Sequence, residues 1–329
     1  MISNVPVLLL IYNRPELTRR VFDRLREAAP KQLFIAADGP RSDRPNEVAL
    51  CAETRSIVNE IDWPCEVHRL FREENLGCKS AVSNAITWFF EHVEEGIILE
   101  DDCVPHPTFF RFCNELLEYY RYDERIMVIS GDNFQHGRRR TQYSYYFSRY
   151  NHIWGWATWR RAWQYYDGEM KYWPDLRNTS WLFDILGTQD AADYWYNIFD
   201  KAYAGEIDSW GYPWTFSCWV QNGLTILPEV NLVSNIGFGD TATHTKNSDS
   251  TAANIPTFPI QFPLRHPPYM VRHRDADQYT FDTHFRATQG SSPMAYNHLI
   301  YQLISRAPYA KNVKSFLRLI TTTLMKRGA

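Results

Sequence analysis

The sequence of 329 residues lacks the features that mark several large classes of protein. Its six cysteines include no Cys-x-x-Cys pair and no regular spacing, which argues against a zinc or disulfide framework and indicates reduced thiols in a cytosolic protein. A net charge of −3 provides no basic surplus for nucleic acid. No apolar run is long enough to cross a membrane, and residues 1–6 lack the basic flank and apolar core of a signal peptide.

Aromatic residues, in contrast, are abundant. They make up 16% of the chain and include 12 Trp and 20 Tyr. Most aromatic side chains fill protein cores, and that is the first expectation here. A surplus of this size also suits a site that stacks on sugar rings or nucleobases, because a flat apolar face matches either ligand.

Apolar segments of strand length alternate with segments of helical periodicity in the first 130 residues. This alternation predicts an α/β fold with a doubly wound, largely parallel sheet. Each predicted strand ends in polar residues, and these ends are expected to converge on one crevice. The predicted strands cover residues 5–12, 33–37, 66–71, 96–99 and 126–129, and the predicted helices cover residues 17–28, 46–60, 81–89 and 109–120.

The most informative segment is the predicted strand at residues 96–99, which runs directly into Glu100-Asp101-Asp102. Packing gives no reason for three adjacent acids at the end of a buried strand, because each charge loses hydration there. The carboxyl end of a strand is, however, where α/β sheets bind ligands. Carboxylate oxygens suit Mg²⁺ or Mn²⁺, ions that usually accompany a phosphate. A solvated acidic turn is the alternative interpretation.

The order of short motifs along residues 5–244 resembles that of GT-A-fold glycosyltransferases. The acidic triplet resembles the variant DxD motif of the N-acetylglucosaminyltransferase I family, and later segments resemble the acceptor-side, base-bearing, Pro-Glu and histidine positions of that family. In chain order, the matching segments are Asn13-Arg14-Pro15, Asp38-Gly39, Glu74-Asn75-Leu76-Gly77, Glu100-Asp101-Asp102, Asn151-His152-Ile153-Trp154-Gly155-Trp156, Asp208-Ser209-Trp210, Pro228-Glu229 and His244.

The resemblance implies a donor site at the carboxyl ends of the first strands. Asp102 would bind Mn²⁺ or Mg²⁺, whose charge stabilises a departing diphosphate. Glu100 and Asp101 would bind hydroxyls of the ribose and the donor sugar. Further contacts with the nucleotide sugar would come from Asn13, Arg14, Asp38, Asn75 and Lys79. Each of these contacts has a plainer alternative interpretation. The residue would be an ordinary turn residue or, in the case of Glu100 and Lys79, a solvated surface charge.

An inverting transfer needs a general base that takes the proton of the attacking hydroxyl. The resemblance makes Asp208 the leading candidate. Asp167 and Asp240 are rival candidates, and a capping or turn role is the alternative for each of the three.

The remaining implied contacts lie on the acceptor side. Trp154, Trp156 and Trp210 would form a stacking platform for the acceptor, although a place in the core is an equal alternative. His244 would bind the metal or donate to the diphosphate, unless it is an exposed loop residue. Three further histidines have no metal-ligand spacing and receive no role: His266, His273 and His284.

The resemblance divides the chain into three parts. Residues 1–130 form the nucleotide-sugar-binding half, and residues 131–300 form an aromatic-rich, acceptor-side half of the same domain. The latter includes residues 241–253, which we expect to be a mobile loop near the site. Residues 301–329 form an amphipathic basic helix, which either docks on the body of the protein or contacts an anionic membrane surface.

The sequence therefore predicts a metal-dependent, inverting glycosyltransferase. It would move a sugar from a UDP- or GDP-sugar to a glycan or lipid-linked acceptor, in surface polysaccharide synthesis at the cytoplasmic face of the membrane. Two alternatives stay open. A sugar-1-phosphate nucleotidylyltransferase would need a glycine-rich basic loop where this chain has Tyr12-Asn13-Arg14-Pro15. A non-catalytic carbohydrate-binding or scaffold protein would have no use for the acidic triplet, which costs stability without a metal.

Overall fold

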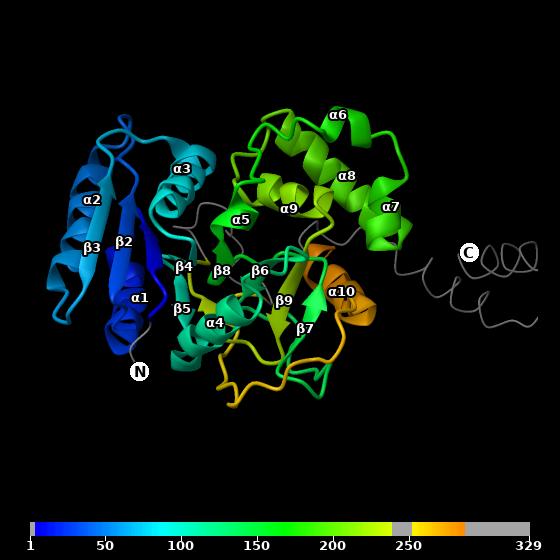
Figure 1. Ribbon diagram of the computed structural model, residues 1–329. Coiled ribbons are helices and arrows are strands. Elements are labelled where there is room, and N and C mark those ends of the chain that lie inside the picture. Colours follow the sequence, from blue (N-terminus) through cyan, green and yellow to red (C-terminus); the bar gives the residue numbers. More distant parts are fainter. Residues whose placement is uncertain (1–3, 239–251, 287–329) are drawn as a thin grey trace, which may run out of the picture. The chain divides into compact units, whose positions relative to one another are not determined.

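The structure is a computed structural model, which describes residues 4–238 and 252–286. Residues 1–285 form one compact unit, in which helices surround a central sheet (Figure 1). Most of the predicted loop at 241–253 and the whole of the predicted helix at 301–329 lie outside the described residues. Within the described ranges, no helix combines the length and the apolar character needed to span a membrane.

The described strands form one large sheet and one small ribbon. They are β1 (Val7–Ile11), β2 (Gln32–Ala37), β3 (Glu66–Phe71), β4 (Glu95–Glu100), β5 (Cys103–Pro105), β6 (Ile126–Ser130), β7 (Tyr145–Ser148), β8 (Trp156–Trp159), β9 (Leu224–Pro228) and β10 (Val233–Asn235). The described α-helices are α1 (Pro15–Ala28), α2 (Pro45–Ile57), α3 (Gly77–His92), α4 (Pro107–Tyr119), α5 (Arg160–Trp163), α6 (Trp173–Leu176), α7 (Trp181–Leu186), α8 (Gln189–Tyr203), α9 (Gly211–Val220) and α10 (Arg274–Thr280).

The central sheet has eight strands in the order β3-β2-β1-β4-β8-β6-β9-β7. Strands β1 to β4 pair in parallel, and β6 runs parallel to β9. Strand β8 lies antiparallel between β4 and β6, so β6 and β9 point the same way as β1. Only β8 and the edge strand β7 oppose this direction among the described strands. The carboxyl ends of β1, β2, β4, β6 and β9 therefore share one edge of the sheet.

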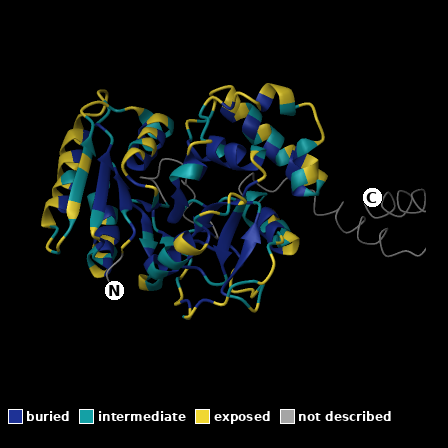
Figure 2. Cartoon of the chain, in the orientation of Figure 1, coloured by how far each residue is buried: buried dark blue, intermediate teal, exposed yellow. Residues whose placement is uncertain are grey.

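The sheet is covered on both faces, which explains its continuous apolar strands. In β1, Val7, Leu9 and Ile11 belong to one hydrophobic cluster with α1 and α4. Leu8 and Leu10 point the other way, into a cluster with α3, α8 and α9. Figure 2 shows the central strands as buried and the outward side of α2 as exposed.

Helix α1 illustrates how local sequence sets an element. Pro15 lies at its first turn, where the missing N–H costs nothing, and Ala29 ends it in a left-handed conformation with φ of 45°. Val21 and Leu25 recur on its buried side and pack against the sheet. This register places Arg14 immediately before the helix, at the carboxyl end of β1.

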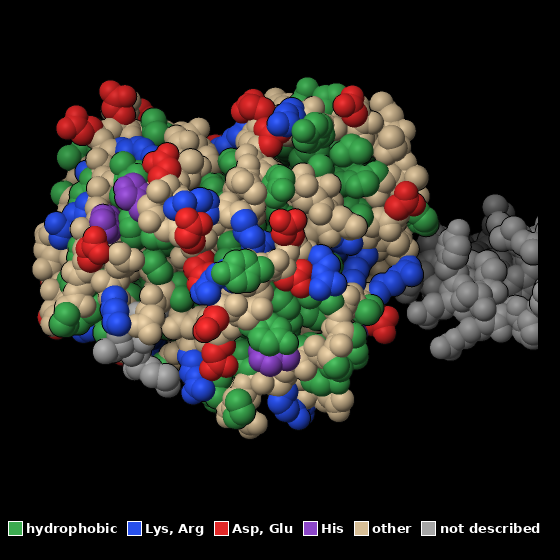
Figure 3. All heavy atoms as spheres, in the orientation of Figure 1, with side chains coloured by type: hydrophobic (Ala, Val, Ile, Leu, Met, Phe, Trp, Pro, Cys, Tyr) green, Lys and Arg blue, Asp and Glu red, His purple; other side chains and the backbone are tan. Residues whose placement is uncertain are grey.

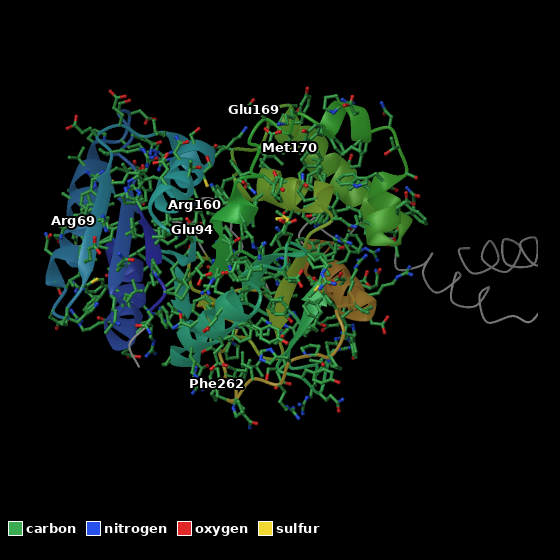
Figure 4. All side chains as sticks on the ribbon, in the orientation of Figure 1. Arg69, Glu94, Arg160, Glu169, Met170 and Phe262 are labelled. Atoms are coloured by element: carbon green, nitrogen blue, oxygen red, sulfur yellow. The ribbon has the colours of Figure 1, made fainter. Side chains whose placement is uncertain are left out.

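The aromatic-rich half is mainly core. Trp156, Trp173 and Trp214 are fully buried, and they belong to the cluster that α8 and α9 pack against the sheet. Arg160 anchors α5 to the turn before β4, because its guanidinium contacts Glu94 at 2.6 Å (Figure 4). On the face shown in Figure 3, acidic and basic side chains are interspersed over the surface.

Strands β5 and β10 form a short antiparallel ribbon beside the sheet, with Asn235 opposite Cys103. The ribbon brings the segment after β10 against the acidic triplet after β4. Its position cannot be read from hydrophobic periodicity, because each strand has only three residues.

The predicted α/β class and largely parallel sheet are confirmed. The first five predicted strands correspond to β1, β2, β3, β4 and β6, and the four predicted helices to α1 to α4, with ends shifted by a few residues. The insertion of antiparallel β8 between β4 and β6 was outside the prediction. Strand β8 pairs both neighbours through Trp156 to Trp159, a segment in which crowded aromatics obscured the period.

Candidate functional site

A cavity of about 330 Å³ opens at the carboxyl edge of the sheet, between the ends of β1, β2 and β4 and the start of α3. This is the crevice that the polar strand ends predict. Its lining residues include Tyr12, Arg14, Asp38, Arg41, Arg72, Asn75, Gly77, Cys78, Glu100, Asp101 and Asp208. Five predicted site residues thus meet in one cavity, together with Asp208: Arg14, Asp38, Asn75, Glu100 and Asp101.

Arg14 is the counter-charge of the acidic triplet. Its guanidinium binds both carboxylate oxygens of Asp101 and contacts Asp102 Oδ2 through Nη1 at 3.0 Å. Asp101 and Asp102 are only 3% and 7% exposed, so the pairing occurs where charges are poorly hydrated. Burial opposes the charge of Arg14, but the neighbouring carboxylates outweigh it and raise the pKa of Arg14.

The triplet carries more negative charge than Arg14 can neutralise. Burial raises the pKa of Glu100, and the charges of Asp102 and Asp101 raise it further. Burial also raises the pKa of Asp101, although Arg14 acts in the opposite direction. No described side chain donates a hydrogen bond to the Glu100 carboxylate, which faces the cavity. Three carboxylates against one guanidinium favour an additional cation or a proton.

Asp102 is enclosed by the segment that follows β10. Asn235 Nδ2 lies 3.4 Å from Asp102 Oδ1, and the Ile236 N–H donates to the Asp102 carbonyl at 2.9 Å. A Cβ on Gly237 would lie 2.0 Å from Asp102 Oδ2, so only glycine fits at this position. Sequence analysis missed Asn235 and Gly237, because no local pattern links them to a strand end so distant in the chain.

The other end of the cavity is built around Asp38. Its carboxylate accepts hydrogen bonds from the Leu76 N–H at 3.0 Å and from Asn75 Nδ2 at 3.0 Å. Burial raises the pKa of Asp38, while the backbone N–H donors lower it. Asn75 also donates to the carbonyl of Gly39 at 2.9 Å, and a Cβ on Gly39 would collide with the Glu74 backbone at 2.4 Å. The ends of β2 and β3 are therefore held at a fixed spacing.

Tyr12 belongs to a network that sequence analysis also missed. Its hydroxyl donates to Glu47 Oε2 at 2.6 Å and accepts from Asn75 Nδ2 at 3.1 Å. Arg41 pairs with the same carboxylate and holds the pKa of Glu47 at about 2. Glu47 is buried on α2, so its charge fixes Tyr12 and Arg41 at the cavity wall. The sequence offered only a weak signal, because Glu47 stands at helical spacing from Cys51 and Thr54 on one face of α2.

Asp208 reaches this cavity from far along the chain. Its carboxylate accepts hydrogen bonds from the N–H groups of Cys78 at 2.9 Å and Lys79 at 3.0 Å, in the first turn of α3. The residue at the N-cap position, Leu76, has no side chain that can cap the helix. Asp208 therefore supplies the cap, which was the alternative to its role as a base, while it also lines the cavity.

Lys79, Asn13 and Asp102 are not among the residues that line the cavity. The Lys79 ammonium lies 3.5 Å from Glu169, next to Met170 in Figure 4. Its side chain is 26% exposed, so in this arrangement it is neither part of the cavity wall nor fully solvated. Asp167 is likewise not a lining residue, and its carboxylate accepts hydrogen bonds from the N–H groups of Glu169 and Lys171 in a turn.

The predicted stacking platform needs a correction. Trp156 is fully buried and Trp210 is 3% exposed, and their rings stack on each other with centroids 5.6 Å apart. Neither ring presents a free face to an acceptor, because hydrophobic burial has placed both in the core. Trp154 is only partly buried, and its ring lies edge-on to Phe134 and Phe238.

The histidine predictions have separate outcomes. His244 and the rival base Asp240 lie outside the described residues. His273 caps α10 by accepting the Ala276 N–H at 3.2 Å, and His266 bonds to the Tyr145 hydroxyl at 2.8 Å. Within residues 4–238 and 252–286, no group of three or more His, Cys, Asp or Glu side chains has the arrangement of a metal site.

Comparison with known proteins gives only distant matches. No protein-family model matches the sequence, and no curated protein matches it. The fold is similar to HddC from Yersinia pseudotuberculosis, with a TM-score of 0.30 and 11% identity over 48% of this chain and 77% of that chain. A second structure of HddC, complexed with GMP-PN, has a TM-score of 0.30 and 12% sequence identity, again over 48% of this chain and 77% of that chain. A cytidylyltransferase from Leptospira borgpetersenii has a TM-score of 0.31 and 11% sequence identity over 50% of this chain and 63% of that chain. Scores at this level assign no activity to this chain.

Proposed function

We propose that this protein is a glycosyltransferase that moves a sugar from a nucleoside diphosphate to a hydroxyl of a glycan or lipid-linked acceptor. The observation that carries the proposal is the cavity at the carboxyl edge of the sheet. One end is lined by Glu100 and Asp101 beside Arg14, which also contacts Asp102 behind the cavity wall, and the other end holds the Asp38–Asn75–Tyr12 network. Such an arrangement suits a ligand with a base and ribose at one end and a diphosphate at the other.

Each wall of the cavity has a distinct part in the proposed reaction. Asp38 and Asn75, locked by backbone and side-chain hydrogen bonds, offer polar atoms in fixed positions to the base and ribose. Arg14 offers a guanidinium at the start of α1, where the helix N-terminus adds its own partial positive charge to the diphosphate site. Glu100, which lacks a donor among the described side chains, is available to a sugar or ribose hydroxyl.

A divalent cation fits the chemistry of the triplet. The carboxylates are hard oxygen ligands, and their charge exceeds that of Arg14. Because the described residues contain no complete metal site, Asp102 would hold Mn²⁺ or Mg²⁺ together with oxygens of the donor diphosphate. When bound, such an ion supplies Lewis-acid stabilisation of the leaving diphosphate. Asn235 and Gly237 would keep the Asp102 carboxylate in place.

Asp208 is the proposed general base of an inverting transfer. Two backbone N–H donors orient its carboxylate on the cavity wall. A carboxylate has about four lone-pair sites, so two accepted hydrogen bonds leave room for the hydroxyl of an acceptor. The capping role and the catalytic role are therefore compatible in one side chain.

The two alternative functions make different demands on the site. A sugar-1-phosphate nucleotidylyltransferase must hold a triphosphate. Here only Tyr12, Asn13 and Arg14 separate β1 from α1, which leaves no glycine-rich loop to surround a triphosphate. A carbohydrate-binding protein without catalysis would bind a sugar in a manner that does not depend on a nucleotide or a metal.

The deciding experiment is a thermal-shift panel of nucleoside mono-, di- and triphosphates and nucleotide sugars, each with and without Mn²⁺. It is run on the wild type, on Asp102→Ala and on Asp62→Asn, an exposed control whose carboxylate contacts only Arg26 at 3.2 Å. A metal-dependent shift with one nucleoside diphosphate, lost only in Asp102→Ala, supports the proposal. Release of pyrophosphate from a triphosphate and a sugar 1-phosphate would instead identify a nucleotidylyltransferase. No shift with any nucleotide would refute both enzymes.

A further inference from the structure

A second polar cluster lies at the same edge of the sheet as the cavity. Asp132 follows β6, and His152 lies in the segment that leads into β8. Their side chains are 2% and 1% exposed, and Asp132 Oδ2 lies 3.4 Å from His152 Nδ1. The Ser130 hydroxyl donates to the other oxygen, Asp132 Oδ1, at 2.8 Å. A buried carboxylate and a buried imidazole thus lie together in a part of the fold that the proposed donor site does not use.

The cluster has unused hydrogen-bonding capacity. Asp132 Oδ2 and His152 Nδ1 form an ion-pair contact at 3.4 Å, but among the described residues neither these two atoms nor His152 Nε2 has a partner with hydrogen-bond geometry. An unsatisfied buried polar group costs about 1–3 kcal/mol, so native proteins normally provide it with a partner. The partner is either ordered water or a hydroxyl-bearing ligand.

Aromatic rings surround the Asp132–His152 pair. The Phe134 ring lies 4.6 Å from the His152 ring and 5.1 Å from the Trp154 ring, measured between centroids. It also stacks on His284 at 4.1 Å. Trp154, Phe238 and His284 are only partly buried, so the aromatic side of the cluster reaches the surface, whereas the Asp132 and His152 side chains are enclosed. Aromatic faces beside carboxylate and imidazole groups form the combination that binds pyranose rings.

The cluster adjoins the acidic triplet through one short segment. Gly237 lies against the Asp102 carboxylate, and the next residue, Phe238, contacts Trp154 with ring centroids 5.6 Å apart. On the other side, the Gly131 N–H donates to the Gly155 carbonyl at 2.8 Å and joins the ends of the two segments. A sugar at the cluster would therefore lie beside the diphosphate end of the cavity.

We propose that Asp132, His152 and the Trp154 ring form a subsite for a pyranose ring of the reaction. The inference rests on the proposed glycosyltransferase function and adds the sugar-recognising residues to it. Asp132 Oδ2 accepts a hydrogen bond from a sugar hydroxyl, His152 donates or accepts a second one, and Trp154 stacks on the apolar face of the ring. The sugar is either the one carried by the donor or the terminal one of the acceptor.

The test uses Asp132→Asn and His152→Asn, with Asp62→Asn as the surface control. Calorimetric titration measures the affinity for nucleoside diphosphates and for the corresponding nucleotide sugars in the presence of Mn²⁺. Saturation-transfer NMR measures the binding of methyl glycosides of glucose, galactose, mannose and N-acetylglucosamine. Loss of a hydrogen bond between a sugar hydroxyl and a charged group should weaken sugar binding about 10- to 100-fold and leave nucleoside diphosphate binding unchanged.

The results separate the two sources of the sugar. If the variants lose affinity for the nucleotide sugar but not for the diphosphate, the subsite holds the donor sugar. If nucleotide-sugar affinity is retained but the methyl-glycoside signal disappears, it holds the acceptor. Unchanged sugar binding in folded variants would overturn the subsite and leave buried water as the partner. If Asp132→Asn does not fold, Trp154→Ala provides the same comparison, because the Trp154 ring is partly exposed.

Failure of the proposed function gives a different result. In that case no nucleotide binds with any metal, whereas a glycoside signal that disappears in Asp132→Asn would still support the subsite.

Discussion

The guanidinium of Arg14 and the carboxylate of Asp101 face each other across the carboxyl ends of β1 and β4. The contact involves both carboxylate oxygens, and it joins the start of α1 to the acidic triplet. A neighbouring contact to Asp102 makes Arg14 the shared partner of two acids. The positions of the Asp101 and Asp102 carboxylates in the ligand-free protein thus depend on the guanidinium of Arg14, and this dependence can be measured.

Replacement of Arg14 by Gln should lower the free energy of unfolding at pH 7 by about 3–5 kcal/mol, because it leaves the buried Asp101 carboxylate without its oppositely charged partner. The loss should shrink as pH falls, since protonation removes the unpaired charge. In the variant, the folded-state pKa of Asp101 rises because the lowering effect of Arg14 is gone. Urea unfolding between pH 4 and pH 8 measures both effects. A pH-independent difference would show that Arg14 stabilises the fold by packing alone.

Glu100→Gln should alter the pH dependence of stability. The pKa of Glu100 is raised in the folded protein, so the folded state binds the proton more tightly than the unfolded state does. Stability from this group is complete below the ordinary glutamate pKa of 4.5 and is lost as pH rises through the higher folded-state pKa. The variant should lose less stability than the wild type between pH 5 and pH 9 in urea unfolding. Parallel profiles for the two proteins would contradict this assignment.

Gly237→Ala should disable the site without unfolding the protein. The new Cβ would lie 2.0 Å from Asp102 Oδ2, so either the carboxylate or the 235–238 segment must move. We expect loss of the metal-dependent thermal shift with nucleoside diphosphate. The matched control is Gly168→Ala, whose added Cβ would meet its nearest atoms at 3.5 Å, an ordinary contact. Equal nucleotide shifts in both variants would show that Asp102 tolerates displacement.

Asp208→Asn separates the capping role from the catalytic role. Asn keeps one side-chain oxygen that can accept from the Cys78 or Lys79 N–H, so the variant loses mainly the negative charge at the start of α3, at a cost of about 0.3–1 kcal/mol of stability. Loss of a general base should reduce the transfer rate by about 10²- to 10⁴-fold while donor affinity is retained. Unfolding curves and initial rates are compared at a temperature where the variant is fully folded. A rate that falls only with the folded fraction would leave Asp208 a cap and nothing more.

The two tryptophans of the Trp154-Gly155-Trp156 segment should respond differently to alanine. Trp156 is fully buried against Trp210 and Trp214, so its removal should cost about 3–5 kcal/mol in chemical unfolding. Trp154 is partly exposed, and its removal should cost less and affect sugar binding instead. A large stability loss in Trp154→Ala with unchanged sugar binding would make it a core residue.

The sequence predicted those parts of the molecule that depend on local patterns. Apolar runs and helical spacing located β1 to β4 and α1 to α4, because burial on both sheet faces and on one helix face imposes these periods. The triplet at residues 100–102 was recognisable because hydrophobic packing cannot explain three charged residues at the end of a buried strand. Arg14 and Asp38 followed from their positions at neighbouring strand ends.

Other parts depend on contacts that no local pattern records. Asp208 caps α3 across 130 positions, and Gly237 is required only because Asp102 lies against it. The period of the aromatic segments was unreadable, because rings there pack on all sides. Trp156 and Trp154 consequently looked alike in sequence, although one lies in the core and the other near the surface.

The ribbon of β5 and β10 has a consequence for the order in which the protein is assembled. Asn235 and Asp102 meet across 133 positions of the chain, so this contact closes a long loop. A polypeptide ending before β9 would contain every acid of the triplet and Arg14, but neither Asn235 nor the backbone that encloses Asp102. During synthesis, the parallel half of the sheet can form on the ribosome while the site is still incomplete. Every residue that lines the cavity lies before β9, so the enclosure of Asp102 is the last part of the site to be completed.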